Sequence, residues 1–217
     1  MKLIKKYTIN TEMEIKTGLH IGGSSDSVEI GGVDNPVIRK SLDNIPYIPG
    51  SSIKGKIRCL LEQINGASDV GNIDAINEVF GFSDKDRGKP SKLIVRDAYL
   101  TDESKKILEE SEYTDMPFTE VKSENRIDRV SGTASDPRRM ERVPAGVKFD
   151  VEFVINVWDN EEDGQKSLNL IKEGLKALEL DYLGGSGSRG YGKVAFNWEM
   201  IDNYKEKDMT KLLENEE

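Results

Sequence analysis

The sequence predicts an α+β protein of the ferredoxin-like type, an antiparallel sheet with helices on one face. Two observations predict the elements: apolar residues alternate over 9–19 and 147–157, and they recur at helical spacing over 51–64 and 168–178. A third is their order, which reads β-α-β-β-α-β once shorter strands at 93–98 and 194–200 are included. That order is the split βαβ arrangement.

In the first half of the chain we expect a strand over 9–19 and then a long loop over about 22–46. Pro49 and Gly50 precede a helix with a serine as its N-cap, because short polar side chains satisfy free N–H groups there. The helix has one apolar face, made of Ile53, Ile57, Leu60, Leu61 and Ile64. A second strand is expected at 93–98.

In the second half, residues 118–146 depart from the minimal fold and predict a protruding hairpin. A regular strand follows at 147–157, a second helix ends before Gly184 and Gly185, and the last strand covers 194–200 before a charged tail expected to fray. We therefore expect a single domain, 1–217, with insertions at about 22–46 and 118–146.

Composition excludes several classes of protein. With one cysteine (Cys59) and one histidine (His20), the chain can form neither an internal disulfide nor a Cys/His zinc site. It contains no apolar run near 18 residues, so we expect no membrane partner and a reducing cytoplasmic location.

The net charge of −9 argues against nucleic acid until its distribution is considered. Residues 44–61 carry three basic side chains and no acid, and 126–148 is rich in arginine. Because the local field decides a contact, a basic groove is compatible with an acidic chain. For any single cluster, a solvated face is the alternative.

The segment 184–193, GGSGSRGYGK, holds five glycines and Arg189 between a helix and a strand. A dinucleotide fingerprint requires the reverse order, and a P-loop requires Ser or Thr where Val194 stands. A glycine-rich backbone can approach an anion closely. We therefore predict a loop that binds an RNA backbone through Gly185, Ser186, Gly187, Ser188, Arg189 and Gly190; a helix C-cap with a flexible connection is the alternative.

The start of the first helix is a second candidate grip. Helix N-termini attract phosphate, and this one adds hydroxyl, ammonium and guanidinium groups. The RNA-binding candidates are Ser51, Ser52, Lys54, Lys56 and Arg58, with an ordinary capped helix as the alternative.

Asp34 and His20 are the catalytic candidates. A lone aspartate can hold Mg²⁺ or another hard divalent cation such as Mn²⁺ if RNA oxygens complete the shell, or it can orient a 2′-hydroxyl. In a Gly/Asn/Pro setting it can equally be an Asx-turn residue. His20, at the end of the first strand, can lie beside it or be a structural histidine.

The insertion ENRIDRVSGTASDPRRMERVP interleaves arginines with apolar residues. Guanidinium groups follow phosphates or stack on bases, and apolar side chains can wedge between bases. Its RNA-binding candidates are Arg126, Arg129, Arg138 and Arg139; a solvent-exposed hairpin is the alternative.

These motifs together resemble a known family. HIGG, GGVDNPVIRK, IPYIPGSSIKGKIR, SENRIDRVSGTA, ERVPAG and GGSGSRGYGKV occur in the order seen in the backbone subunits of type III-A CRISPR effector complexes, the repeated RAMP subunit of the Csm assembly. The resemblance implies a RAMP fold and a filament of copies along a CRISPR RNA (crRNA), with other type III-A subunits as partners.

For the individual residues, the resemblance implies metal-dependent cleavage of paired target RNA at Asp34. It implies that the helix start and the glycine loop hold the guide, and that 118–146 is a thumb that displaces a nucleotide. Two alternatives stay open: a non-catalytic crRNA-binding filament subunit, and a type III-B backbone subunit.

Overall fold

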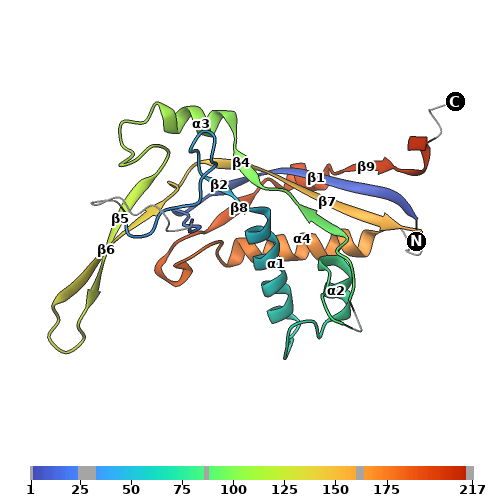
Figure 1. Ribbon diagram of the computed structural model, residues 1–217, viewed down its shortest axis with the longest axis horizontal. Coiled ribbons are helices and arrows are strands. Elements are labelled where there is room, and N and C mark those ends of the chain that lie inside the picture. The colour runs from blue at the N-terminus through green and yellow to red at the C-terminus, as the bar shows by residue number, and fades with distance from the viewer. Residues whose placement is uncertain (1, 24–32, 86–87, 160–163, 214–217) are drawn as a thin grey trace.

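The computed structural model describes residues 2–23, 33–85, 88–159 and 164–213. Its centre is an antiparallel sheet, with a separate two-stranded hairpin projecting from one end (Figure 1). The elements are β1 (Leu3–Ile15), β2 (Tyr47–Ile48), α1 (Gly50–Ile64), α2 (Asp74–Phe80), β3 (Leu93–Val95), β4 (Ala98–Leu100), α3 (Asp102–Glu109), β5 (Glu120–Ile127), β6 (Ala134–Arg142), β7 (Lys148–Trp158), α4 (Gln165–Leu180), η1 (Gly187–Arg189), β8 (Val194–Phe196), α5 (Trp198–Asp202), β9 (Lys205–Asp208) and η2 (Thr210–Leu213).

The main sheet has the order β2-β4-β7-β1-β8, with β3 also paired to β7 and β9 to β1. The long central pair β1 and β7 runs from Leu3 opposite Trp158 to Glu14 opposite Lys148. Helices α1 and α4 pack on one face of this sheet (Figure 1). The α+β split βαβ architecture is confirmed.

The core lies between this sheet face and the two helices, because each element buries one face of its period. The odd positions of β1 and the apolar stripes of α1 and α4 are almost fully buried. These residues are Ile9, Met13 and Ile15 in β1, Ile53, Ile57 and Leu61 in α1, and Ile171, Leu175 and Leu178 in α4.

Three predicted boundaries are wrong, two because of a contact distant in sequence and one because of a local helix cap. The strand expected at 9–19 spans Leu3–Ile15, since β9 pairs with its first half and Lys5 binds Glu206. The tail expected to fray is ordered over β9 for the same reason. The last strand stops at Phe196, because the Asn197 side chain accepts the Met200 N–H and begins α5.

The junction at 96–97 corrects two further predictions. The strand expected over 93–98 is two strands, β3 and β4, interrupted at Arg96 and Asp97. The Asp97 carboxylate accepts the N–H of Gly50 at 2.8 Å, at the first residue of α1. Pro49 therefore occupies the N-cap with no side-chain cap of its own, and the serine cap is wrong.

The two insertions differ in form. Residues 118–146 contain the β5–β6 hairpin, whereas 24–32 of the first insertion lie outside the described residues. The sequence did not predict α2 or α3. The predicted domain boundaries stay a prediction. No helix in the described part of the chain is long and apolar enough to cross a membrane.

Candidate nucleic-acid interface

The glycine loop and the hairpin face each other across a cavity of about 250 Å³. Arg189 comes from the loop, and the other lining residues come from β5 and β6: Glu124, Asn125, Arg126, Asp136 and Arg138. Three guanidinium groups thus surround a space that also contains two carboxylates. The site favours an anion whose charge is extended, such as a phosphodiester chain.

Two of the loop glycines are needed for packing. A Cβ at Gly187 would lie 2.0 Å from Cγ of Tyr182, and Gly192 has φ +71° with its Cβ position 2.0 Å from the Leu183 carbonyl oxygen. The Tyr182 ring in turn lies 3.8 Å from the Lys56 ammonium. Close packing therefore accounts for part of the glycine density that the sequence analysis assigned to an anion.

The loop is joined to the hairpin through Glu124. Tyr191 donates its hydroxyl to this carboxylate at 2.8 Å, and Arg189 lies 3.3 Å from the second oxygen. Burial, reinforced by the charge of Glu124, raises the pKa of Tyr191 to about 12, so the hydroxyl keeps its proton. The side chain of Arg189 is 54% exposed, which leaves its guanidinium accessible to a phosphate.

The basic residues of α1 have other partners. Lys54 donates to Ser91 Oγ at 2.6 Å and to the Leu93 carbonyl at 2.9 Å. Arg58 binds Glu62, the Gly81 carbonyl and Asn77, and Lys56 pairs with Asp181 at 2.9 Å. These bonds link α1 to other segments of the same chain, so the basic groups already have partners within the protein.

The helix start itself is partly closed. The Asp97 carboxylate holds the Gly50 N–H, and the Gly50 Cβ position is 2.2 Å from the Val95 carbonyl oxygen. Ser51 is exposed and Ser52 is partly exposed. The geometry thus favours a structural role for this end of α1, and RNA binding by Ser51, Ser52, Lys54, Lys56 and Arg58 stays a prediction.

Asp34 lies against the base of the hairpin. Its Oδ2 accepts the backbone N–H of Arg139 in β6 at 2.8 Å, and the neighbouring Asn35 bridges to Met140. The carboxylate is therefore held by a strand 105 residues away rather than by an Asx turn of its own loop. Asp34 is exposed, so one edge of its carboxylate faces solvent beside the arginines of β6.

Glu141 anchors this arrangement, and sequence reasoning missed it. The residue is 1% exposed; its carboxylate accepts hydrogen bonds from the Val37 N–H (2.7 Å), Arg39 (2.5 Å) and Thr119 (2.6 Å). Burial alone would raise the pKa of Glu141, but these donors and the charge of Arg39 hold it below the ordinary value. No spacing pattern identifies the residue, because the partners of its carboxylate come from two segments that are both distant in sequence, 37–39 and Thr119.

His20 connects Glu141 to the glycine loop. Its Nδ1 lies 2.7 Å from the Glu141 carbonyl oxygen, which only accepts, so Nδ1 donates this hydrogen bond. The His20 carbonyl accepts the Gly185 N–H at 2.8 Å. The residue is 9% exposed. Through these two contacts His20 links β6 to the glycine loop.

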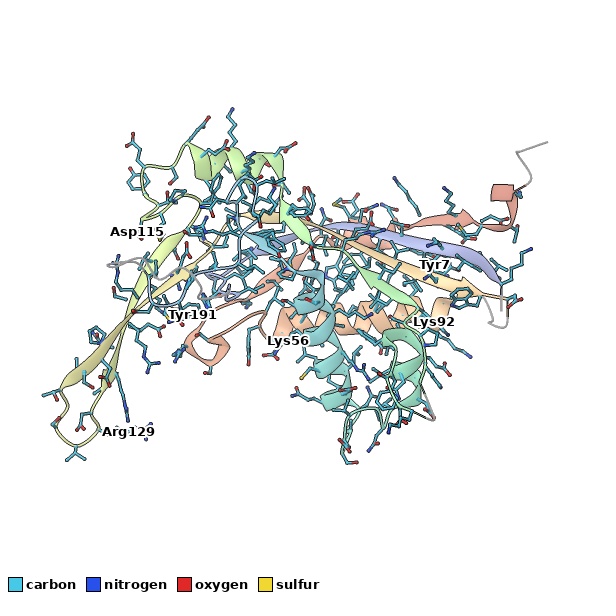
Figure 2. The ribbon with its side chains drawn as sticks, viewed as in Figure 1. Tyr7, Lys56, Lys92, Asp115, Arg129 and Tyr191 are labelled. Carbon is cyan, nitrogen blue, oxygen red and sulfur yellow. The ribbon has the colours of Figure 1, made fainter. Side chains whose placement is uncertain are left out.

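Residues 125–139 of the hairpin are exposed to solvent. Arg126, Arg129, Arg138 and Arg139 are exposed, and so are the apolar side chains of Ile127 (64%) and Val130 (98%). Figure 2 shows Arg129 at the end of the hairpin, far from the sheet core. Exposed arginines and exposed apolar side chains thus lie on one projecting element, and their contact with RNA stays a prediction.

The described residues include no group of three or more His, Cys, Asp or Glu side chains able to hold a metal ion. Asp34 therefore offers a single carboxylate, with Oδ2 already bonded to Arg139. Such a donor fits a hard cation that keeps several waters and takes further oxygens from a substrate.

The split βαβ sheet defines a ferredoxin-like protein. Its glycine-rich loop and arginine-bearing hairpin are features suited to binding a polyanion. The model of the RAMP superfamily matches residues 12–195. The chain is 42% identical over 217 residues to the "CRISPR system Cms endoribonuclease Csm3" of Streptococcus thermophilus, covering 96% of both chains. It is 46% identical over 205 residues to the protein of the same name from Methanocaldococcus jannaschii, covering 88% of this chain and 78% of that one.

Comparison with solved structures gives the same family. A Csm3-Csm4 subcomplex of the type III-A CRISPR-Cas interference complex matches with TM-score 0.59 and 33% identity over 96% of this chain and 90% of that one. A type III-B Cmr-beta chain matches with TM-score 0.63 but 18% identity over 94% of this chain and 61% of that one, which shows the fold alone. The chain belongs to the RAMP superfamily and, within it, to the family of the Csm3 endoribonucleases. The resemblance to type III-A backbone subunits is confirmed.

Proposed function

We propose that this chain is a repeated backbone subunit of a type III-A CRISPR ribonucleoprotein, which binds crRNA along a filament of copies and cleaves complementary target RNA. Its partners are crRNA, target RNA, further copies of itself and the other type III-A subunits, in the cytoplasm. The whole-length similarity to Csm3 endoribonucleases supports this role. A non-catalytic filament subunit is the second candidate, and a type III-B subunit is disfavoured by the lower identity.

The observation that carries the proposal is the position of Asp34. Its carboxylate is held on β6 by the Arg139 N–H, where the arginine-bearing hairpin leaves the sheet. Through Glu141 the same strand contacts His20, whose carbonyl holds the glycine loop. A candidate catalytic carboxylate therefore lies on the arginine-bearing hairpin, which Glu141 and His20 link to the glycine loop.

The proposed grip on RNA needs no base recognition. Arg126, Arg138 and Arg189 line one cavity and bind phosphates, while Ile127 and Val130 separate bases at the hairpin end. Sequence is read by pairing between guide and target, so backbone contacts and wedges suffice.

We further propose that cleavage requires Mg²⁺ or Mn²⁺ held by Asp34 and by RNA oxygens. The bound cation would offset the negative charge that develops on the scissile phosphate. The Asp34 carboxylate would hold the cation next to the arginines of β6, and the Arg139 N–H holds this carboxylate in one orientation. The backbone carbonyl of His20 accepts the Gly185 N–H and so keeps the glycine loop in place.

Metal removal tests this site. Assembled complex is incubated with complementary RNA in EDTA, and fragments are followed on a denaturing gel. We expect cutting to stop and to return with added Mg²⁺ or Mn²⁺, because without the cation the negative Asp34 carboxylate repels the charge that develops on the phosphate. Target binding on a native gel is the control, and cutting that continues unchanged in EDTA contradicts the metal role.

The role of the glycine loop is tested with Arg189→Ala. We expect weaker guide retention and a salt slope smaller by roughly 0.7, the value for one phosphate contact on a single strand. The measurement is filter binding of guide RNA between low and high salt. Lys106→Ala is the matched control, since that side chain is 73% exposed on α3. An unchanged slope for Arg189→Ala shows that this guanidinium does not contact phosphate.

A further inference from the structure

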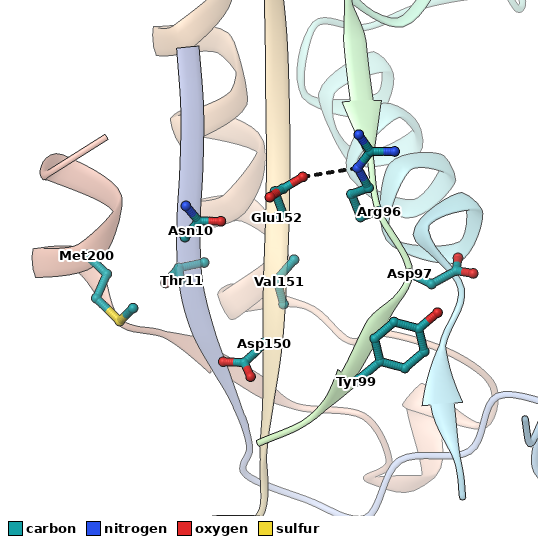
Figure 3. Close-up of a pocket in the computed structure, with 9 residues that line it drawn as sticks. All are labelled: Asn10, Thr11, Arg96, Asp97, Tyr99, Asp150, Val151, Glu152 and Met200. Carbon is teal, nitrogen blue, oxygen red and sulfur yellow. Dashed lines mark hydrogen bonds and ion pairs between the residues drawn. The ribbon is translucent and has the colours of Figure 1, made fainter. Parts of the chain in front are cut away.

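The sheet face opposite α1 and α4 carries a groove that the proposed RNA contacts do not use. It consists of two adjoining hollows, about 360 Å³ and 290 Å³, that share Asn10 and Met200. Figure 3 shows the larger one, where side chains of β1, β7 and the β3–β4 segment stand on the same side of the sheet. No element in the described part of the chain covers it.

Strand pairing sets the side chains of the larger hollow in two rows. In the first, Tyr99 of β4 stands opposite Asp150 of β7, which stands opposite Glu12 of β1. In the second, Glu152 stands opposite Asn10 and binds Arg96 at 3.0 Å (Figure 3). Asp150 and Glu152 are two residues apart on β7, so both project from the open face.

The groove lacks a cation at its centre. Glu152 is neutralised by Arg96, and Glu12 binds Lys148 at 2.8 Å. Asp150 pairs with no lysine or arginine among the described residues. Partial burial, then the charges of Glu12 and Asp102, raise the pKa of Asp150.

The walls suit the side chain of a lysine or arginine. Tyr99 is 47% exposed, and an ammonium group, that of Lys40, already lies 5.2 Å from the centre of its ring. Met200 from α5 borders the other side and supplies apolar contact for an alkyl chain. A carboxylate, an aromatic ring and an apolar wall together recognise a long cationic side chain.

The charges that line the groove argue against two other occupants, RNA and a second copy of this chain. RNA phosphates are repelled by Asp150, which has no basic partner among the described residues, whereas the second hollow carries one acid, Glu199, and one base, Lys205. A second copy of this chain has net charge −9, and its exposed arginine cluster, Arg126, Arg129, Arg138 and Arg139, is on the hairpin assigned to RNA. A different protein with a basic surface is complementary to the groove.

We infer that the open sheet face is a docking surface for a basic segment of a different protein subunit, with a lysine or arginine side chain seated between Tyr99 and Asp150. The inference rests on the proposed function only in placing the chain within a multi-protein complex. It adds a protein-binding face that is separate from the RNA-binding cavity at Arg189.

The test uses the whole complex, purified through a tag on this chain and weighed by native mass spectrometry. For Asp150→Lys we expect one protein subunit of another sequence to fall by roughly tenfold, as when a buried interface charge is reversed. Guide RNA content should stay unchanged. Glu110→Lys, 70% exposed at the C-cap of α3, is the matched control and should leave the composition intact.

A photo-crosslinker at Asn10 then identifies the occupant. We expect a crosslink to a segment with lysine or arginine, and a Lys→Glu or Arg→Glu change there should restore the subunit to Asp150→Lys complexes. Unchanged composition for Asp150→Lys, or a crosslink to RNA or to a second copy, overturns the inference. Wild-type complex without guide RNA would instead refute the proposed function, so the two failures are distinguishable.

Discussion

Replacing Asp34 by asparagine is expected to lower target cleavage by the assembled complex at least ~100-fold while target RNA still binds. The amide oxygen of asparagine can still accept the Arg139 N–H, so the loop stays docked on β6. What is lost is the negative charge that would hold the cation. Cleavage is measured in single-turnover assays with Mg²⁺, and binding is measured on native gels.

The pair Asp34→Asn and Asp34→Ala separates charge from position. Alanine removes both the charge and the bond to Arg139, whereas asparagine removes only the charge. The free energy of unfolding of both variants should lie within ~1 kcal/mol of the wild-type value, because the residue is exposed. The control is Asp69→Asn, in the exposed loop after α1, and a complex with this variant should cleave target RNA at the wild-type rate. If Asp34→Asn cleaves at the wild-type rate, the chain is a scaffold and the nuclease role is wrong.

Replacing Glu141 by alanine is expected to destabilise the protein by about 3–5 kcal/mol, the usual effect of breaking a buried ion pair. Arg39 would lose its carboxylate partner while only 13% exposed, and the N–H of Val37 would lose its acceptor. Thermal or urea unfolding measures the loss, and at this chain length Tm falls by roughly 2–4 °C per kcal/mol. Glu110→Ala, at an exposed position, should stay within ~0.5 kcal/mol of wild type.

The same residue predicts a pH dependence. The pKa of Glu141 in the folded protein lies below its ordinary value of 4.5, so the charged carboxylate contributes stability above about pH 4.5. That contribution is lost as the pH falls through the folded-state pKa. The stability difference between wild type and Glu141→Gln should therefore shrink below this pH. A difference that stays constant down to the acid transition would show that Arg39 and Thr119 do not hold this carboxylate charged.

Local patterns in the sequence were sufficient to predict the main elements. The alternation at 147–157 and the helical spacings at 51–64 and 168–178 correspond to β7, α1 and α4, because burial of one face repeats with the period of each element. The strand limits at Leu3, Asp97 and Phe196 were not predictable in this way. The first two depend on partners remote in sequence, β9 and the start of α1, and the third depends on the Asn197 side chain that begins α5.

The candidate site divides in the same way. Residue types and motif order were enough to single out Asp34, His20, the hairpin arginines and the glycine loop, and to identify the family. Their meeting through Glu141, and the internal partners of Lys54 and Arg58, were decided by the tertiary structure alone. A charge pattern records which groups a chain carries, but whether a carboxylate or a cation is left for a ligand depends on the partners that folding brings within hydrogen-bond distance.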